Sequence, residues 1–570
     1  MSKRWLLQQV NDKDAIKRLM NELNVDEKIA AMLVLRGVTN FDEAKKFFRP
    51  SLEDLHDPFL MKGMQAAVER LNRAINNNEN ILVYGDYDVD GTTAVSLMYS
   101  FLTSFYPNVA YYIPDRYTEG YGISFKGIDF AYDNNFSLVI SLDCGIRSVD
   151  KIDYANEKQI DFIICDHHLP ADEIPNAIAV LDPKQKDCNY PYKELTGCGV
   201  GYKLIQAYCI KNNIPVETTY QYLDLLAISC AADIVPITGE NRVFTTFGLK
   251  LINENPRPGI KALLEQSNVK KQLTVSDLVF IIGPRINAAG RIQSGMNAVE
   301  LLTSPDLEKA RETALLINKN NLERKELDLQ ITNEALRIIE ENSVLQQRKT
   351  TVLYSEQWHK GVIGIVASRL TEKYYRPTIL LTESNGKATG SARSVKDFDV
   401  HAAIEACSDL LEQFGGHKYA AGLTMPIENV QKFIERFEEV VSSRIHDDML
   451  IPAIDIDAYI SLSDITPKFY RIIKQFAPFG PGNLSPMLAS KNVIAKSGTS
   501  RIVGNNHLKT TVYQIENPDI CFDMIAFNFG DWFDYINSGK TFDICYHIEE
   551  NEWNGNVSLQ LNVKDIKTEN

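Results

Sequence analysis

Ile81-Leu-Val-Tyr-Gly-Asp86-Tyr-Asp88-Val-Asp90-Gly91 is an apolar run that stops abruptly at carboxylates. Three later segments repeat this pattern: residues 137–143, 161–168 and 225–233. Short apolar runs that end at a carboxylate are typical of buried parallel strands, which carry ligands to the carboxyl edge of an α/β sheet. The four segments therefore predict an α/β fold whose metal-type ligands meet at one sheet edge.

The composition is that of a large globular protein. The chain has 570 residues, 44% of them hydrophobic and 24% charged, and at about 100 to 200 residues per domain this length predicts roughly three to five domains. No apolar run is long enough to cross a bilayer, and polar residues follow Met1 too soon for a signal peptide. We therefore expect a cytoplasmic protein.

The cysteines and the net charge argue against two classes of protein. The nine cysteines are scattered singly, with no Cys-x-x-Cys pair, so a disulfide or zinc framework is not expected. The net charge of −15 disfavours a protein that coats nucleic acid non-specifically, because phosphate neutralisation needs clustered Lys and Arg. A local basic groove beside a metal site remains compatible with this charge.

The order of the predicted elements divides the chain into five parts. Helical periodicity dominates the start, strands alternate with helices in two later regions, and short alternating strands close the chain. The expected parts are an N-terminal helical segment (1–78), a parallel-sheet α/β domain (79–302), a long connecting helix (303–345), a smaller α/β domain (346–447) and a β-barrel of the oligonucleotide-binding type (448–570).

The carboxylates and histidines at the segment ends predict a metal centre. Asp88 and Asp90 alternate along the chain, and Gly91 permits a tight turn into a helix. Taken alone, this pattern also fits a helix cap, as Asp143 does, and the pair His167 and His168 also fits an ordinary surface. Taken together, the ligands suit two Mn²⁺ or Mg²⁺ ions, with Asp143 as the candidate bridge.

The smaller α/β domain carries a second signal. Gly390-Ser391-Ala-Arg393-Ser394 and Phe414-Gly-Gly-His417 combine small glycines with hydroxyl, guanidinium and imidazole donors. This inventory fits a phosphate-binding pocket, although a glycine-rich turn is the simpler alternative.

These motifs resemble the DHH phosphoesterase superfamily. Its four motifs match, in order, residues 86–91, Leu142-Asp143-Cys-Gly145, Asp166-His167-His168 and Ala232-Asp233-Ile-Val-Pro236. Within the superfamily, the chain is similar over nearly its whole length to the RecJ family of bacterial single-strand-specific 5′→3′ exonucleases.

The resemblance implies roles for individual residues. The family's metal ligands correspond to Asp88, Asp90, Asp143, His167 and Asp233, and His168 is implied to complete the catalytic set. Asp86 and Asp166 are implied to orient these ligands from a second layer. The implied phosphate-binding residues are Arg116, Arg285, Arg369, Ser391, Arg393 and His417.

The function expected from the resemblance is metal-dependent hydrolysis of single-stranded DNA from its 5′ end to 5′-mononucleotides, in DNA repair and recombination. Single-stranded DNA is the expected partner, a helicase and a single-strand-binding protein are candidate partners, and a monomer without membrane contact is expected.

Two alternatives stay open. One is a phosphodiesterase of short RNA oligonucleotides or cyclic dinucleotides, which the additional residues 448–570 disfavour. The other is a non-catalytic nucleic-acid-binding scaffold, which the filled ligand positions disfavour.

Overall fold

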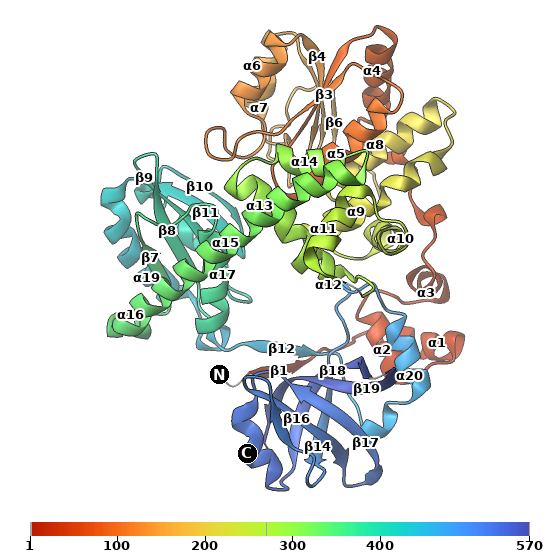
Figure 1. The fold of residues 1–570 in the computed structure, drawn as a ribbon, viewed down its shortest axis with the longest axis vertical. Helices are drawn as coiled ribbons and strands as arrows, with labels where there is room; N and C mark the ends of the chain where they lie inside the picture. Colours follow the sequence, from red (N-terminus) through yellow and green to blue (C-terminus); the bar gives the residue numbers. More distant parts are fainter. Residues whose placement is uncertain (1–2, 270, 554, 569–570) are drawn as a thin grey trace. The chain divides into compact units, whose positions relative to one another are not determined.

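The computed structural model describes residues 3–269, 271–553 and 555–568 (Figure 1). The chain forms two compact units. The central unit comprises Ser51–Ile445 and Gly480–Gly482, and the terminal unit comprises Met1–Pro50, His446–Phe479 and Asn483–Asn570. One unit is thus made from the middle of the chain and the other from both of its ends.

The central unit contains a parallel five-stranded sheet in the order β3-β2-β4-β5-β6, of which β3, β4 and β6 are labelled in Figure 1. The strands are nearly continuous apolar runs because helices cover both faces of the sheet. Their bounds are β2 (Asn80–Gly85), β3 (Val109–Tyr112), β4 (Phe136–Leu142), β5 (Asp161–Cys165) and β6 (Ala179–Leu181).

Alternate residues of β2 enter two different cores. Ile81 and Val83 lie in a core that includes α4, α5 and α8, whereas Leu82 and Tyr84 lie in a core with α6 and α7. The bounds of these and the following helices are α4 (Met64–Asn76), α5 (Val89–Thr103), α6 (Phe125–Asp133), α7 (Val149–Glu157), α8 (Gly197–Lys211), α9 (Leu223–Ala232), α10 (Gly239–Glu254), α11 (Pro258–Ser267), α13 (Gly283–Ile292) and α14 (Met296–Leu302).

The fourth predicted strand is wrong: residues 225–233 lie in and after helix α9. Every residue from Leu223 to Ala231 is buried. A helix that is apolar all round shows no amphipathic period, and its Leu and Ala residues favour the helix. Periodicity alone therefore could not separate this buried helix from a buried strand.

Helix α15 (Leu307–Glu341) connects the first sheet to a second, mixed sheet. It packs against α13 and against α17 (Ile363–Tyr374) (Figure 1). The second sheet has the order β10-β11-β9-β8-β7, with β7 (Thr351–Tyr354), β8 (Thr378–Ser384), β9 (Lys387–Arg393), β10 (Gln413–His417), β11 (Ala420–Met425), α18 (Val400–Glu405) and α19 (Val430–Arg444) around it. In the part of the chain that the structure describes, no helix has the length and apolar character to cross a membrane.

The terminal unit contains a closed β-barrel. Pairing of β14 with both β18 and β16 closes the series β14-β18-β19-β17-β16, as in the oligonucleotide-binding fold. Its strands are β13 (Ala458–Tyr459), β14 (Leu488–Ala495), β15 (Arg501–Val503), β16 (His507–Gln514), β17 (Asn517–Ala526), β18 (Phe542–Trp553) and β19 (Asn556–Lys567).

The expected N-terminal segment of residues 1–78 is divided at residue 50. Helices α1 (Lys13–Leu23), α2 (Glu27–Val34) and α3 (Phe41–Phe48) share one apolar core with the barrel and with α20 (Pro467–Lys474). Strand β1 (Arg4–Leu7) pairs in parallel with β12 (Ala453–Ile456). Residues 51–78 belong instead to the central unit, where α4 covers the parallel sheet.

A buried ion pair anchors residues near the start of the central unit. Lys203 Nζ lies 2.6 Å from Glu240 Oε1, and the two side chains are 0% and 1% exposed. Lys203 also donates to the His56 carbonyl, and Glu240 accepts from the His56 N–H and the Tyr190 hydroxyl. Burial lowers the pKa of Lys203 because removal from water disfavours the ammonium.

We expect Lys203→Met to destabilise the central unit by about 3 to 5 kcal/mol, because it leaves the Glu240 carboxylate buried without its cation. The thermal unfolding midpoint of the variant should fall below that of the wild type. The double variant Lys203→Met with Glu240→Gln should recover part of the loss. An unchanged midpoint in the single variant would contradict a role for the pair in stability.

Candidate metal centre and phosphate cleft

Asp88 and Asp90 lie at the start of α5, directly after β2. Asp88 caps this helix, and its side chain accepts a hydrogen bond from the Gly91 N–H at 3.0 Å. A Cβ on Gly91 would lie 2.4 Å from the Asp86 carbonyl oxygen, so only glycine allows this close turn. The turn keeps both carboxylates at the carboxyl edge of the sheet.

Asp143 and His167 follow the neighbouring strands β4 and β5. Asp143 has a φ of +60°, a left-handed conformation that is uncommon for residues other than glycine and that clusters at functional sites. Its Oδ1 lies 3.1 Å from His167 Nε2, and Oδ2 of Asp90 and Oδ2 of Asp233 lie 3.7 and 3.6 Å from the same nitrogen. Asp233 reaches this point from the end of α9.

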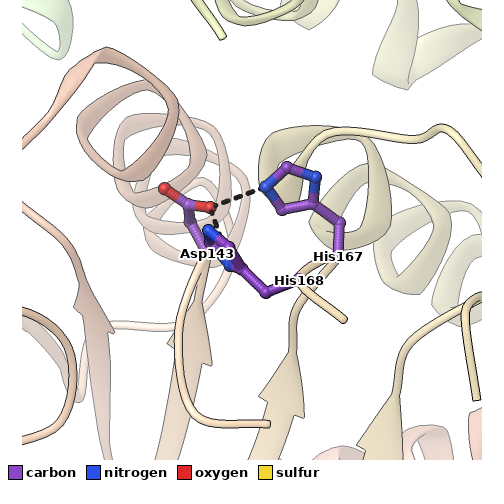
Figure 2. A group of neighbouring side chains, drawn as sticks. All are labelled: Asp143, His167 and His168. Atoms are coloured by element: carbon purple, nitrogen blue, oxygen red, sulfur yellow. Dashed lines mark ion pairs between the residues drawn. The ribbon is translucent and has the colours of Figure 1, made fainter. Parts of the chain in front are cut away.

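His168 also faces the Asp143 carboxylate, with its ring beside that of His167 (Figure 2). Its Nδ1 lies 4.0 Å from Asp143 Oδ1 and 2.7 Å from Asp166 Oδ1, and its Nε2 lies 3.2 Å from the Tyr121 hydroxyl. Burial alone would lower the pKa of His168, but the hydrogen bond and charge of Asp166 raise it to about 9. Asp166 therefore orients the His168 ring and favours its protonated form.

Asp86 and Asp166, the two carboxylates predicted to orient the ligands, have different hydrogen-bond partners. Asp166 accepts hydrogen bonds from the Ile146 and His167 N–H groups. Burial alone would raise the pKa of Asp166, but the hydrogen bond from His168 holds this pKa well below its usual value. Asp86 accepts from the Gly122 N–H at 3.3 Å. Burial, and then the charge of Asp88, raise the pKa of Asp86.

The cluster has the properties of a cation site. Burial and the charges of Asp90 and Asp88 raise the pKa of Asp143 well above its usual range. His167 is 6% exposed, and although its Nε2 lies at ion-pair distance from Asp143 Oδ1, neither ring nitrogen makes a hydrogen bond of acceptable geometry with the described residues. Buried polar atoms rarely lack partners, and a divalent cation would satisfy both the imidazole and the crowded carboxylates.

Two overlapping groups of side chains offer donor atoms for such a cation. They are Asp143 with His167 and His168, and Asp90 with His167 and Asp233, each with its donor atoms within 4.8 Å of one another. Carboxylate oxygens with imidazole suit Mn²⁺ or Mg²⁺. These groups bring together four of the five predicted ligands, Asp90, Asp143, His167 and Asp233, together with His168, whereas Asp88 belongs to neither group.

A cleft of about 740 Å³ in the central unit adjoins the cluster. His168 and Asp166 line it, and the second sheet contributes Ser391 from β9 and His417 from β10. Arg116 lines the cleft and lies over the Tyr87 ring at 5.1 Å. The structure thus brings three of the predicted phosphate-binding residues to the metal-ligand cluster.

Guanidinium groups gather beside this cleft. Burial lowers the pKa of Arg393, whose Nε donates to Ser368 Oγ at 3.1 Å and whose Nη1 donates to the Ala392 carbonyl at 2.7 Å. Burial, and then the charges of Arg116, Arg324 and Arg393, lower the pKa of Arg291 to about 10. Such mutual repulsion is characteristic of a site built for an anion.

Arg291 and Lys360 are two further cationic residues near the predicted phosphate-binding residues, and the sequence did not single them out. Arg291 lies only six residues after Arg285 in Gly283-Pro-Arg285-Ile-Asn-Ala-Ala-Gly-Arg291, and Lys360 lines the cleft, where burial and then Arg116 lower its pKa. Arg285 and Arg291 both lie on helix α13, and the sequence contains no pattern that identifies one of them rather than the other as the phosphate-binding residue.

Arg285 and Arg369 do not line the cleft. Arg285 donates to Asn318 Oδ1 at 3.2 Å and to the Ile281 carbonyl at 2.7 Å. Arg369 donates to Asp328 Oδ2 of α15 at 2.8 Å. The structure thus does not place these two predicted phosphate-binding residues in the lining of the cleft, and Arg393 is likewise absent from it.

The comparisons with known proteins match this architecture. Residues 80–230 match the DHH family, N-terminal domain, residues 347–443 match the DHHA1 domain and residues 456–565 match the RecJ OB domain. The single-stranded-DNA-specific exonuclease RecJ of Bacillus subtilis is 36% identical over 99% of this chain and 70% of its own length.

Solved structures extend the similarity to three dimensions. RecJ of Thermus thermophilus in complex with Mn²⁺ aligns with a TM-score of 0.84 at 26% identity, over 100% of this chain and 80% of that one. The same protein with Mg²⁺ aligns with a TM-score of 0.79 at 25% identity, over 100% and 79%. With a relative that is 36% identical and is matched over 70% of its length, the chain belongs to the RecJ family of single-stranded-DNA-specific exonucleases.

Proposed function

We propose that the chain hydrolyses single-stranded DNA stepwise from its 5′ end and releases 5′-mononucleotides, in DNA repair and recombination. The observation that carries this proposal is one cleft that joins the carboxylate–histidine cluster to phosphate-binding side chains on a second sheet. A pocket that grips a terminal phosphate beside the cleavage site selects chain ends over internal positions. Membership of the family supplies the 5′ polarity.

Five side chains are proposed to hold two Mn²⁺ or Mg²⁺ ions: Asp88, Asp90, Asp143, His167 and Asp233. Two divalent ions held there would supply Lewis acidity to the attacking water and to the departing 3′-oxygen. Asp143 is proposed as the shared ligand because its Oδ1 lies within 4.0 Å of a ring nitrogen of both His167 and His168 (Figure 2).

Residues that line the cleft, together with Arg393 and Arg291, which are not among its lining residues, are proposed to bind and orient the strand. Arg116, Ser391, Arg393 and His417 would hold the terminal phosphate and the adjacent backbone, joined by Arg291 and Lys360. His168, with Nδ1 held by Asp166, would present a positive charge to a phosphate oxygen.

We also propose the domain limits 79–302, 303–345, 346–447 and 448–570. The three family matches at 80–230, 347–443 and 456–565 each fall inside one of them, which supports the assignment. The barrel would add a strand-binding surface of the kind used for single strands. Because the substrate is single-stranded, we propose that the enzyme acts after a helicase and alongside a single-strand-binding protein. We also propose that it acts as a monomer in the cytoplasm.

Digestion of one single-stranded DNA, labelled at the 5′ end in one reaction and at the 3′ end in another, tests the function. We expect immediate release of labelled mononucleotide from the 5′-labelled strand and a shortening ladder from the 3′-labelled strand, with Mn²⁺ present. A chelator should stop both reactions, because it removes the divalent ions that supply Lewis acidity for hydrolysis. Activity only on di- to tetranucleotides would instead indicate a small-substrate phosphodiesterase.

A further inference from the structure

The Asp90 carboxylate is held by donors from two helices. Its Oδ2 accepts from the Gly197 N–H at 2.6 Å, and its Oδ1 accepts from the Cys198 N–H at 2.9 Å, both in the first turn of α8. Ser229 Oγ of α9 lies 2.7 Å from Oδ1. Asp90 and Ser229 are both buried, so protein groups rather than bulk water fix the carboxylate.

Ser229 is itself oriented by Thr196. Ser229 Oγ lies 2.6 Å from Thr196 Oγ1, which accepts from the Gly199 N–H at 3.0 Å. Each hydroxyl has one proton, and an ionised carboxylate can only accept. The Thr196 hydroxyl must therefore donate to Ser229 when Ser229 donates to Asp90, which gives the chain of hydrogen bonds a single direction.

The start of α8 also touches the second carboxylate of the cluster. A Cβ on Gly197 would lie 2.5 Å from Asp143 Cβ. Glycine at this position allows the helix to approach Asp143 while its N–H groups bind Asp90. The glycine-rich segment Gly197-Cys-Gly199-Val-Gly201 begins helix α8. These contacts give it a role at the metal centre.

We propose that Ser229, oriented by Thr196, is a positioning residue for Asp90 and thereby sets the affinity of the centre for its divalent cation. With Oδ1 held by Ser229 and α8, Asp90 Oδ2 stays directed to the group formed with His167 and Asp233. Without the hydroxyl, the carboxylate loses one of its three fixed donors. The inference rests on the proposed metal-binding role of Asp90.

Titration calorimetry of the full chain with Mn²⁺ tests this role. Outer partners of metal ligands contribute about 10- to 100-fold to affinity, so Ser229→Ala should raise the Kd for Mn²⁺ about tenfold. At saturating Mn²⁺, kcat should fall less than about threefold, since the ligands themselves remain. Ser96→Ala is the matched control, because its buried hydroxyl donates to the Thr92 carbonyl on α5, and its Kd should stay at the wild-type value.

A second pair of variants keeps the test decisive if Ser229→Ala does not fold. Thr196→Val removes the hydroxyl that orients Ser229 and should weaken Mn²⁺ binding, whereas Thr196→Ser keeps it and should not. Equal Mn²⁺ affinities in wild type, Ser229→Ala and Thr196→Val would overturn the inference even if the wild type digests DNA. Weakened binding in a chain that digests no DNA would instead preserve the inference and refute the proposed function.

Discussion

Asp143→Asn is expected to abolish hydrolysis of single-stranded DNA while leaving the fold intact. The substitution keeps the shape of the side chain but removes the negative charge that lies close to both His167 and His168. Metal-assisted charge stabilisation contributes several kcal/mol, and each 1.4 kcal/mol corresponds to about a tenfold change in rate. The turnover rate should therefore fall by about 1,000-fold or more in the end-labelled assay.

The same substitution should stabilise the metal-free chain. Burial raises the pKa of Asp143, as do the charges of Asp90 and Asp88, so the carboxyl binds protons more tightly in the folded chain than in the unfolded one. The wild type in chelator should therefore lose stability as pH rises above the unfolded pKa of about 4. This loss should be smaller in Asp143→Asn, as measured by thermal unfolding midpoints between about pH 4 and pH 8.

Asp182→Asn provides the control for the hydrolysis measurement. Asp182 is a buried carboxyl that follows β6 at the same edge of the sheet, and it accepts from the Lys184 N–H. Burial raises its pKa to about 7, but it belongs to neither group of candidate ligands. Its hydrolysis rate should stay within about threefold of wild type. Substantial residual cleavage by Asp143→Asn would contradict the proposed bridging role.

Arg393→Ala is expected to remove the preference for a 5′-terminal phosphate. The Arg393 guanidinium is largely buried, and its partners Ser368 Oγ and the Ala392 carbonyl are neutral. A buried cation with neutral partners is stabilised by an anionic ligand. Hydrogen bonds to charged groups contribute about 1.5 to 3 kcal/mol each, so kcat/KM for a 5′-phosphorylated strand should fall about 100-fold.

The discriminating measurement compares strands that carry a 5′-phosphate or a 5′-hydroxyl. The Arg393→Ala variant should cleave the two at similar rates, while the wild type prefers the phosphate. Arg369→Ala is the matched control, since its guanidinium binds Asp328 outside the cleft, and it should keep the preference. An equal loss on both strands would place Arg393 in general strand binding rather than at the terminus.

The strand-borne part of the metal centre could be predicted from the sequence, because three apolar runs end where their ligands are needed. Strands β2, β4 and β5 stop at Gly85, Leu142 and Cys165, just before the first carboxylate of each motif. Asp233 was placed correctly in the chain but on the wrong element, since a helix buried on all sides lacks a period.

The surroundings of the ligands could not be predicted. Ser229 and Thr196 are 33 residues apart, and their hydrogen bonds to each other and to Asp90 depend on how α8 packs against α9. The choice between Arg285 and Arg291 likewise depends on packing: Arg285 donates to Asn318 and to the Ile281 carbonyl, whereas Arg291 lies among the charges of Arg116, Arg324 and Arg393. Such choices are set by tertiary contacts, which leave no short-range pattern in the residues.

The terminal unit has a consequence for protein synthesis. Its helices α1, α2 and α3 complete their core only with residues from position 446 onward. At about 5 to 20 residues per second, a ribosome would need roughly 20 to 80 s to make the intervening chain of about 400 residues. During this time the apolar faces of the nascent N-terminal helices would stay exposed to solvent. Exposed apolar faces of this kind are binding sites for chaperones during translation.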